Sequence, residues 1–181
     1  MKIFIAGARS VKSLNDTVKN RLLSIYRTKG SVLVGDCYGV DAAVQKFFVD
    51  LHYSDVTVFA SNGKARYNIG NWKVENVHVS NTMKGFDFYA QKDAVMADQA
   101  DYGFMIWDGR SKGTLNNMLN LVLRGKKVLV YLSACDKMYV VGSQADLENL
   151  LKICPSDTWR TYRKLIPSGK GIQNTQLSFL R

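Results

Sequence analysis

The sequence predicts an α/β protein with a doubly wound, mainly parallel sheet of about five to seven strands and helices on both faces. Two observations lead to this prediction. Short, continuously apolar runs recur along the 181-residue chain, and loops or segments with apolar residues at helical spacing separate them. Such runs are typical of strands that are buried on both faces, as in a parallel sheet covered by helices.

The first part of the chain alternates between these two patterns. The apolar runs are Lys2–Ala6, Ser31–Val34 and Val56–Phe59. Apolar residues at helical spacing predict helices over Leu14–Lys29 and about Val40–Leu51. The segment Ala60–Lys84 interrupts the alternation, so we expect a long loop there, with a short strand at Val77–Val79.

The second part resumes the alternation around the run Tyr102–Trp107, which we expect to be the central strand. The other predicted elements are helices over about Phe86–Gln99, Leu115–Arg124 and Ser143–Lys152, a strand over Lys127–Leu132, and an edge strand over Met138–Val141. Gly125 is expected to end the second of these helices. Ser143 and Asp146 have the spacing of a capping box, which predicts the start of the third.

The pattern weakens after Pro155, so we divide the chain into one domain, 1–154, and a basic C-terminal appendix, 155–181. Apolar residues between Trp159 and Ile166 predict a short amphipathic helix in the appendix, and Leu177–Leu180 is expected to dock on the body. From Lys152 to Arg181 the chain carries six basic residues and one acidic residue. We expect the appendix to pack on the same domain.

Charge and composition narrow the classes of partner. The formal net charge of +10 favours anionic partners, including nucleotides and nucleic acid. No apolar run is long enough for a membrane span or a signal peptide, so we expect a cytoplasmic protein without membrane contacts. Three widely separated cysteines and two histidines do not form a zinc pattern, and we expect neither a metal nor a cofactor.

The loop after the central strand is the main candidate for a phosphate site. It reads DGRSKGT and leads from a strand into a helix, an arrangement that directs backbone N–H groups and the positive helix end toward an anion. Its candidate phosphate-binding residues are Gly109, Arg110, Ser111, Lys112, Gly113 and Thr114. The alternative is a turn that uses glycine for its geometry alone.

Two other loops are expected at the same edge of the sheet, because ligands of open parallel sheets bind at the carboxyl ends of the strands. The first supplies Gly7, Arg9 and Ser10. The second supplies Gly35, Asp36, Gly39 and Asp41, whose carboxylates suit ribose hydroxyls or a base. For Asp41 the equal alternative is a carboxylate that offsets the helix dipole.

Asp108 and Asp93 are the candidate catalytic residues. Two carboxylates beside a glycosidic bond can act as acid and base or as nucleophile. Tyr67 and Trp72 in the long loop are candidates for stacking on a base, although single aromatic residues more often serve in packing. The chain has no GxGxxG, Walker-type GxxxxGK[ST], GxSxG or HExxH motif.

Four segments, in this order and spacing, resemble the SLOG superfamily, which includes the Lonely Guy and DNA-processing A proteins. They are KIFIAGARS, GDCYGVD, QKDAVMADQADYGFMIWDG and the SKGT turn, and the resemblance covers roughly Met1–Leu132. It is closest to the small stand-alone bacterial and phage members. The resemblance implies a Rossmann-like sheet whose glycine loops bind nucleotides or nucleotide-derived ligands, and it suggests a homo-oligomer.

The resemblance leaves several functions open. Lonely Guy phosphoribohydrolases use a PGGxGTxxE motif, and this chain matches its Gly-Thr at Gly113 and Thr114 but has Asn117 at the glutamate position. Our leading expectation is therefore a binder of a nucleotide or an ADP-ribose-like ligand, acting as a sensor or sequestering protein. The alternatives are an N-glycosidic (phospho)ribohydrolase or deoxyribosyltransferase-type enzyme, and a single-stranded nucleic-acid-binding module.

Overall fold

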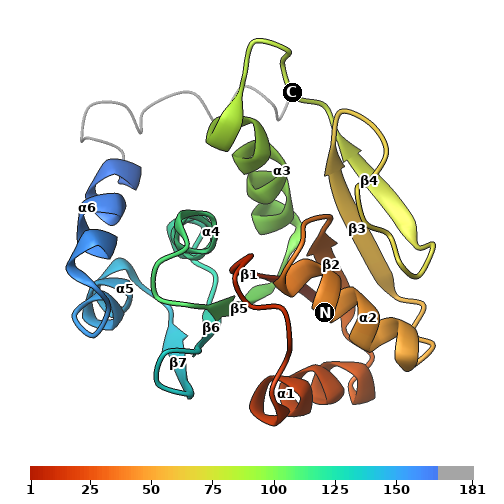
Figure 1. The fold of residues 1–181 in the computed structure, drawn as a ribbon, viewed down its shortest axis with the longest axis horizontal. Coiled ribbons are helices and arrows are strands. Elements are labelled where there is room, and N and C mark those ends of the chain that lie inside the picture. The colour runs from red at the N-terminus through yellow and green to blue at the C-terminus, as the bar shows by residue number, and fades with distance from the viewer. Residues whose placement is uncertain (167–181) are drawn as a thin grey trace.

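The computed structural model describes residues 1–166 and has a seven-stranded sheet in the order β4-β3-β2-β1-β5-β6-β7 (Figure 1). Every neighbouring pair is parallel except β6 and β7, which are antiparallel. The strands are β1 (Lys2–Gly7), β2 (Ser31–Gly35), β3 (Val56–Ser61), β4 (Lys73–Val77), β5 (Tyr102–Trp107), β6 (Val128–Leu132) and β7 (Lys137–Val141). The expected Rossmann-like, mainly parallel sheet is confirmed.

Six helices within the described residues connect and cover the strands. They are α1 (Asp16–Arg27), α2 (Val40–Asp50), α3 (Gly85–Gln99), α4 (Lys112–Leu123), α5 (Gln144–Leu151) and α6 (Ser156–Leu165). Side-chain caps fix two of their starts: Asn15 accepts a hydrogen bond from the Val18 amide, and Ser143 accepts one from the Asp146 amide. The cap at Ser143 is the one that the capping-box spacing predicts.

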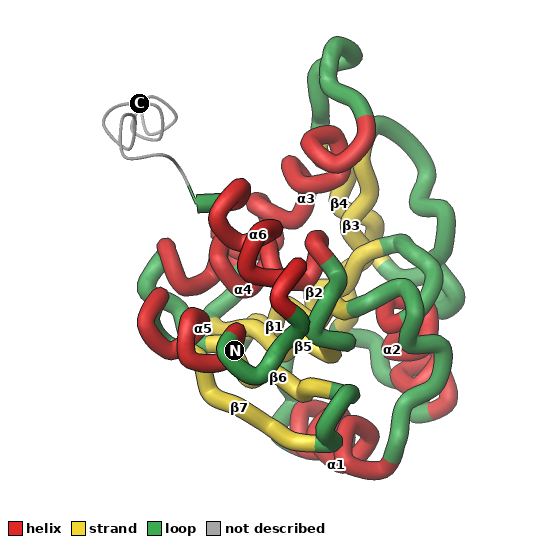
Figure 2. The backbone as a smooth tube through the Cα atoms, turned by 60° about the vertical axis from the view of Figure 1, so that its left-hand side comes forward, coloured by secondary structure: helices red, strands yellow, loops and turns green. Residues whose placement is uncertain are grey.

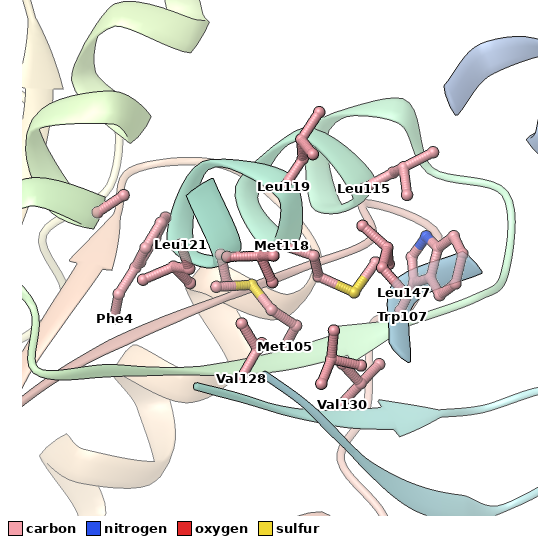
Figure 3. Packing of buried hydrophobic residues seen from close by; sticks show 14 of the residues in the cluster. Phe4, Met105, Trp107, Leu115, Met118, Leu119, Leu121, Val128, Val130 and Leu147 are labelled. Carbon is pink, nitrogen blue, oxygen red and sulfur yellow. The ribbon is translucent and has the colours of Figure 1, made fainter. Parts of the chain in front are cut away.

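The helices form two layers because successive residues of a strand point to opposite faces. On β1, Ile3 and Ile5 pack against α1 and α2, whereas Phe4 and Ala6 belong to the cluster formed with α3, α4 and α5. Figure 3 shows the second cluster, in which Met118 and its neighbours on α4 pack over the strands. Both faces of the central strands are therefore buried, which explains why their sequences are continuously apolar.

The strand order reverses beside β1. The chain builds β2, β3 and β4 outward on one side of β1 and then returns to place β5 on the other side. Gly7 is paired with Ile106 there, so the carboxyl ends of β1 and β5 lie side by side. A crevice outside this pair is the usual ligand position in an open α/β sheet.

The prediction of one long loop over residues 60–84 is wrong in part. Lys73–Val77 forms β4, a parallel edge strand paired with β3, and it overlaps the expected strand Val77–Val79 at one residue only. An edge strand is covered incompletely, so its sequence KVENV mixes polar and apolar residues and does not have the continuous apolar pattern. The connection from β4 to α3 stands out from the body in both views (Figures 1 and 2).

The described part of the C-terminal appendix is built into the fold. Helix α6 lies beside α4 and α5 (Figure 2), Tyr162 is buried in the core, and the Thr158 hydroxyl donates to the Gly109 carbonyl at 2.7 Å. The expected docking of Leu177–Leu180 concerns residues outside the described part. No helix within residues 1–166 combines the length and apolar character needed to cross a bilayer.

Candidate functional site

A cavity of about 530 Å³ opens at the point where the strand order reverses. Gly7, Gly35 and Asp108, at the carboxyl ends of β1, β2 and β5, contribute to its lining. Helices α3 and α4 provide further walls. The volume falls within the range of about 300–1,000 Å³ that is typical of small-molecule sites.

The loop between β5 and α4 is organised by the Asp108 carboxylate. Its Oδ1 accepts hydrogen bonds from the amides of Arg110 (3.0 Å) and Ser111 (2.8 Å), and its Oδ2 accepts one from the Ser10 hydroxyl (2.8 Å). Burial alone would raise the pKa of Asp108, but these donors hold it below its usual value. Asp108 is therefore an ionised carboxylate that ties the β1 and β5 loops together.

The first turn of α4 leaves donors free beside the cavity. Within residues 1–166, the amides of Lys112, Gly113 and Thr114 have no hydrogen-bond partner, and Ser111 makes no side-chain cap. The turn contains no acidic residue, and Gly113 lines the cavity. Free N–H groups at the positive end of a helix dipole favour an anion.

The loop that follows β1 lines the same cavity as the first turn of α4. A side chain at Gly7 would collide with the Ile106 carbonyl and with Val40, so only glycine lets β1 end this close to β5 and α2. Arg9 and Ser10 follow and line the cavity. The Arg9 guanidinium has no carboxylate partner among the ion pairs of the described residues, so its charge is available to a ligand.

A second guanidinium lies at the β2 side of the site. Arg66 makes a bidentate pair with Asp36 (2.8 and 3.0 Å) and stacks over the Tyr89 ring at 4.8 Å. Burial alone would raise the pKa of Asp36, but the hydrogen bonds and charge of Arg66 hold it below its usual value. Asp36 thus fixes Arg66, and Arg66 in turn supports Tyr89, which lines the cavity.

Three charged side chains form a cluster on the cavity lining, in which Asp41 and Lys92 are buried and Asp93 is half-buried; we call it the buried cluster. Lys92 on α3 donates to Asp93 Oδ1 at 2.6 Å, and Asp41 on α2 interacts electrostatically with both. Burial raises the pKa of Asp41 to about 7, against the opposing effect of Lys92. Burial alone would lower the pKa of Lys92, but the two carboxylates raise it above its usual range.

Asn117 on α4 completes this cluster. When the Asn117 side-chain amide is assigned the orientation that satisfies both its oxygen and its nitrogen, the nitrogen donates to the Gly113 carbonyl at 3.2 Å and to Asp93 Oδ2 at 3.1 Å. Both oxygens of Asp93 therefore have donors, one from each of two helices. This network connects the buried cluster to the first turn of α4.

Gly35 is expected to be required for the cluster. A Cβ atom there would collide with Asp41 Oδ2 and lie 3.2 Å from Lys92 Nζ. The variant Gly35→Ala should therefore lose about 1–3 kcal/mol of unfolding free energy in urea denaturation. Gly113→Ala is the control, because a Cβ there meets no atom within 4 Å and alanine favours a helix; a loss of equal size in both variants would contradict the assignment.

Comparison with known proteins identifies no matching family model. No curated protein matches the sequence either.

Nine of the predicted site residues line the cavity together. They are Gly7, Arg9, Ser10, Gly35, Asp41, Asp93, Asp108, Ser111 and Gly113. The other predicted residues do not belong to its lining: Asp36, Gly39, Tyr67, Trp72, Gly109, Arg110, Lys112 and Thr114.

Several of the residues outside the lining have other contacts. The Trp72 indole donates to the Tyr53 carbonyl at 2.8 Å, and Tyr67 packs edge-on against Tyr38. The Lys112 ammonium lies 3.7 Å from the centre of the Phe86 ring. Both aromatic candidates of the β3–β4 connection thus contact other residues of the protein, and their stacking on a base stays a prediction.

Apart from Asp93, the inner face of α3 is not predicted from the sequence as part of the site. Phe86, Tyr89, Lys92 and Met96 line the cavity together with Asp93. Their spacing of three or four residues places them on one face of a helix. The signal in the sequence is a lysine and an aspartate within a stripe of otherwise apolar and aromatic residues. Residues 1–166 hold no group of three or more His, Cys, Asp or Glu side chains placed to bind a metal ion.

Proposed function

We propose that the protein binds a nucleotide or a nucleotide-derived, ADP-ribose-like ligand in this cavity, with a phosphate at the first turn of α4. The observation that carries the proposal is the set of free amides at Lys112, Gly113 and Thr114 beside the cavity. Arg9 adds a guanidinium without a carboxylate partner in the described structure. Amides of a helix start together with an arginine are a common way to hold phosphate.

Aromatic side chains support the nucleotide over a simple phosphate. Phe86 and Tyr89 belong to the cavity lining, and Arg9 and Arg66 lie over the Tyr89 ring at 5.9 and 4.8 Å. Aromatic side chains in a cavity lining can pack against a base. The position at the strand-order reversal and the resemblance to SLOG motifs also support the proposal, and we propose membership of that superfamily on the same grounds.

The proposal is tested by incubating the protein with AMP, ADP-ribose, NAD and the other common nucleotides, followed by mass spectrometry of the protein and the solution. We expect one compound to be retained intact. Arg9→Ala should weaken its binding by about tenfold or more, because a charge-assisted contact is lost. Arg27→Ala, an exposed cation on α1, is the control. If no nucleotide is retained, the proposal fails, and a steep salt dependence of oligonucleotide binding would favour the nucleic-acid alternative.

A second candidate is hydrolysis or transfer at an N-ribosyl bond, and the buried cluster of Asp41, Lys92 and Asp93 favours it. In hydrolysis, water adds its oxygen to C1′ and loses a proton to Asp93. The base departs with the bonding electron pair and takes a proton from the Asp41 carboxyl. The proposal uses Asp93 rather than Asp108, because Asp93 belongs to the same cluster as the Asp41 carboxyl. Free base in the same incubations, lost in Asp93→Asn, is the expected result.

A further inference from the structure

We infer that the buried cluster binds the hydroxyl groups of a ribose, so that the cavity selects ribonucleotides over 2′-deoxyribonucleotides. This inference rests on the proposed function, because it assigns the sugar of the same ligand. It concerns Asp41 on α2 and the pair Lys92 and Asp93 on α3. None of these residues belongs to the first turn of α4, where the phosphate is placed.

Polar atoms of Asp41 and Lys92 lie close together at the cavity wall. Asp41 Oδ2 and Lys92 Nζ both lie close to the point that a Cβ of Gly35 would occupy, and all three residues line the cavity. Glycine at position 35 lets these two polar atoms lie against the end of β2, because a side chain there would collide with Asp41. A small polar group of a ligand that enters the cavity can therefore contact both the carboxyl and the ammonium.

Asp41 and Lys92 each retain unused hydrogen-bonding capacity. Asp41 Oδ2 accepts from the Cys37 amide at 3.2 Å, whereas Oδ1 has no partner within residues 1–166. The side chain is nevertheless buried, with 7% of the residue exposed. Lys92 donates one hydrogen bond, to Asp93, and an ammonium group has three protons to donate. This part of the cavity wall thus offers an acceptor and a donor close together.

The charges of the cluster distinguish between possible ligand groups. Two carboxylates and one ammonium disfavour a second phosphate at this position, because it would meet net negative charge whenever Asp41 is ionised. An apolar group would leave Asp41 and Lys92 unsatisfied. A hydroxyl both donates and accepts, so the neighbouring hydroxyls of a ribose satisfy Asp41 and Lys92 without adding charge.

Hydrogen bonds through Asn117 connect the buried cluster to the first turn of α4 and fix their relative positions. Asn117 contacts Asp93 Oδ2 and the carbonyl of Gly113, so a hydrogen-bonded chain leads from the cluster to the first turn of α4. A ribose follows its 5′-phosphate directly in a nucleotide. The same order is present in the protein, with the anion site first and the hydroxyl site next to it.

The test compares dissociation constants by calorimetry for ribonucleoside 5′-monophosphates with the four common bases and for their 2′-deoxy and 2′,3′-dideoxy counterparts. For the base that binds best, the 2′-deoxy form should bind about 10- to 100-fold more weakly than the ribo form, because a buried charged group loses its partner. The dideoxy form should bind more weakly still. In Asp41→Ala the preference should largely disappear while the deoxy form binds about as in the wild type.

The outcomes separate this inference from the function on which it rests. Ribo and deoxy forms that bind the wild-type protein within about threefold of each other would overturn the inference and leave nucleotide binding intact. Absence of saturable binding for every compound would overturn the inference, and if ADP-ribose and NAD are not retained either, nucleotide binding fails as well. Asp41→Asn keeps the shape of the residue and provides a second variant if Asp41→Ala does not fold; an undiminished ribose preference in a folded variant would also overturn the role of Asp41.

Discussion

Replacing Asp41 by asparagine is expected to abolish a pH dependence of the free energy of unfolding. In the wild-type protein, Asp41 lowers this free energy as the pH rises from 3.8 to about 7. The folded state raises the pKa of Asp41 from 3.8 to about 7, mainly through burial. The native state therefore binds a proton that the unfolded state releases in this interval. The contribution of Asp41 to the free energy of unfolding is fully present below pH 3.8. It is lost as the pH rises through about 7, and the total loss is up to about 4 kcal/mol.

The measurement is urea unfolding of both proteins at several pH values between 4 and 8. The free energy of unfolding of Asp41→Asn should rise relative to that of the wild type until the pH reaches about 7. Above that pH the difference between the two proteins should remain constant. Lys92, Asp93 and Asp36 are the charged groups that act on Asp41, and all are unchanged in the variant. Asp50→Asn, which alters an exposed carboxylate on α2, should show no such trend. A parallel pH dependence of Asp41→Asn and wild type would contradict the prediction.

Replacing Gly113 by aspartate is expected to abolish most of the nucleotide affinity without unfolding the protein. A Cβ at this position meets no atom within 4 Å, so the fold accepts a side chain there. A carboxylate in the first turn suits the helix dipole but occupies the proposed phosphate position. Repulsion between two charges about 4–6 Å apart near a protein surface amounts to about 3–4 kcal/mol, which corresponds to a loss of about 100-fold or more.

Gly113→Asn is the matched control, because it has the same shape without the charge. We expect the asparagine variant to bind the retained nucleotide much more tightly than the aspartate variant, as measured by calorimetry. Thermal unfolding should show that the aspartate variant is no less stable than the asparagine variant. Equal losses of affinity in both variants would assign the effect to space rather than charge and would argue against a phosphate at this turn.

Much of the fold is predictable from the sequence because the central strands are buried on both faces. The continuous apolar runs at Lys2–Ala6 and Tyr102–Trp107 correspond to β1 and β5. Strand β4 was misplaced because an edge strand need not be apolar, and KVENV carries three polar residues. The strand order, and with it the position of the cavity, follows from long-range pairing that no local pattern contains.

Site residues in the loops after the strands could be predicted from the sequence, whereas most of those on the inner face of α3 could not. The loops after β1, β2 and β5 do meet, because strands of a parallel sheet end at one edge. Lys92 lay within a predicted helix, and a charged residue on a helix is exposed more often than buried. Its burial between Asp41 and Asp93 requires the packing of α3 against the strand ends, which the sequence of α3 alone does not specify.

The central claim is that a nucleotide phosphate binds the free amides of the first turn of α4, and a ¹H–¹⁵N NMR titration tests it most directly. The ¹⁵N-labelled protein is titrated with the nucleotide that it retains. The amide signals of Lys112, Gly113 and Thr114 should shift with one common dissociation constant, and they should stay in place in Gly113→Asp. Unchanged signals at this turn, with shifts instead at the exposed basic residues Arg160 and Arg163 of α6, would contradict the claim.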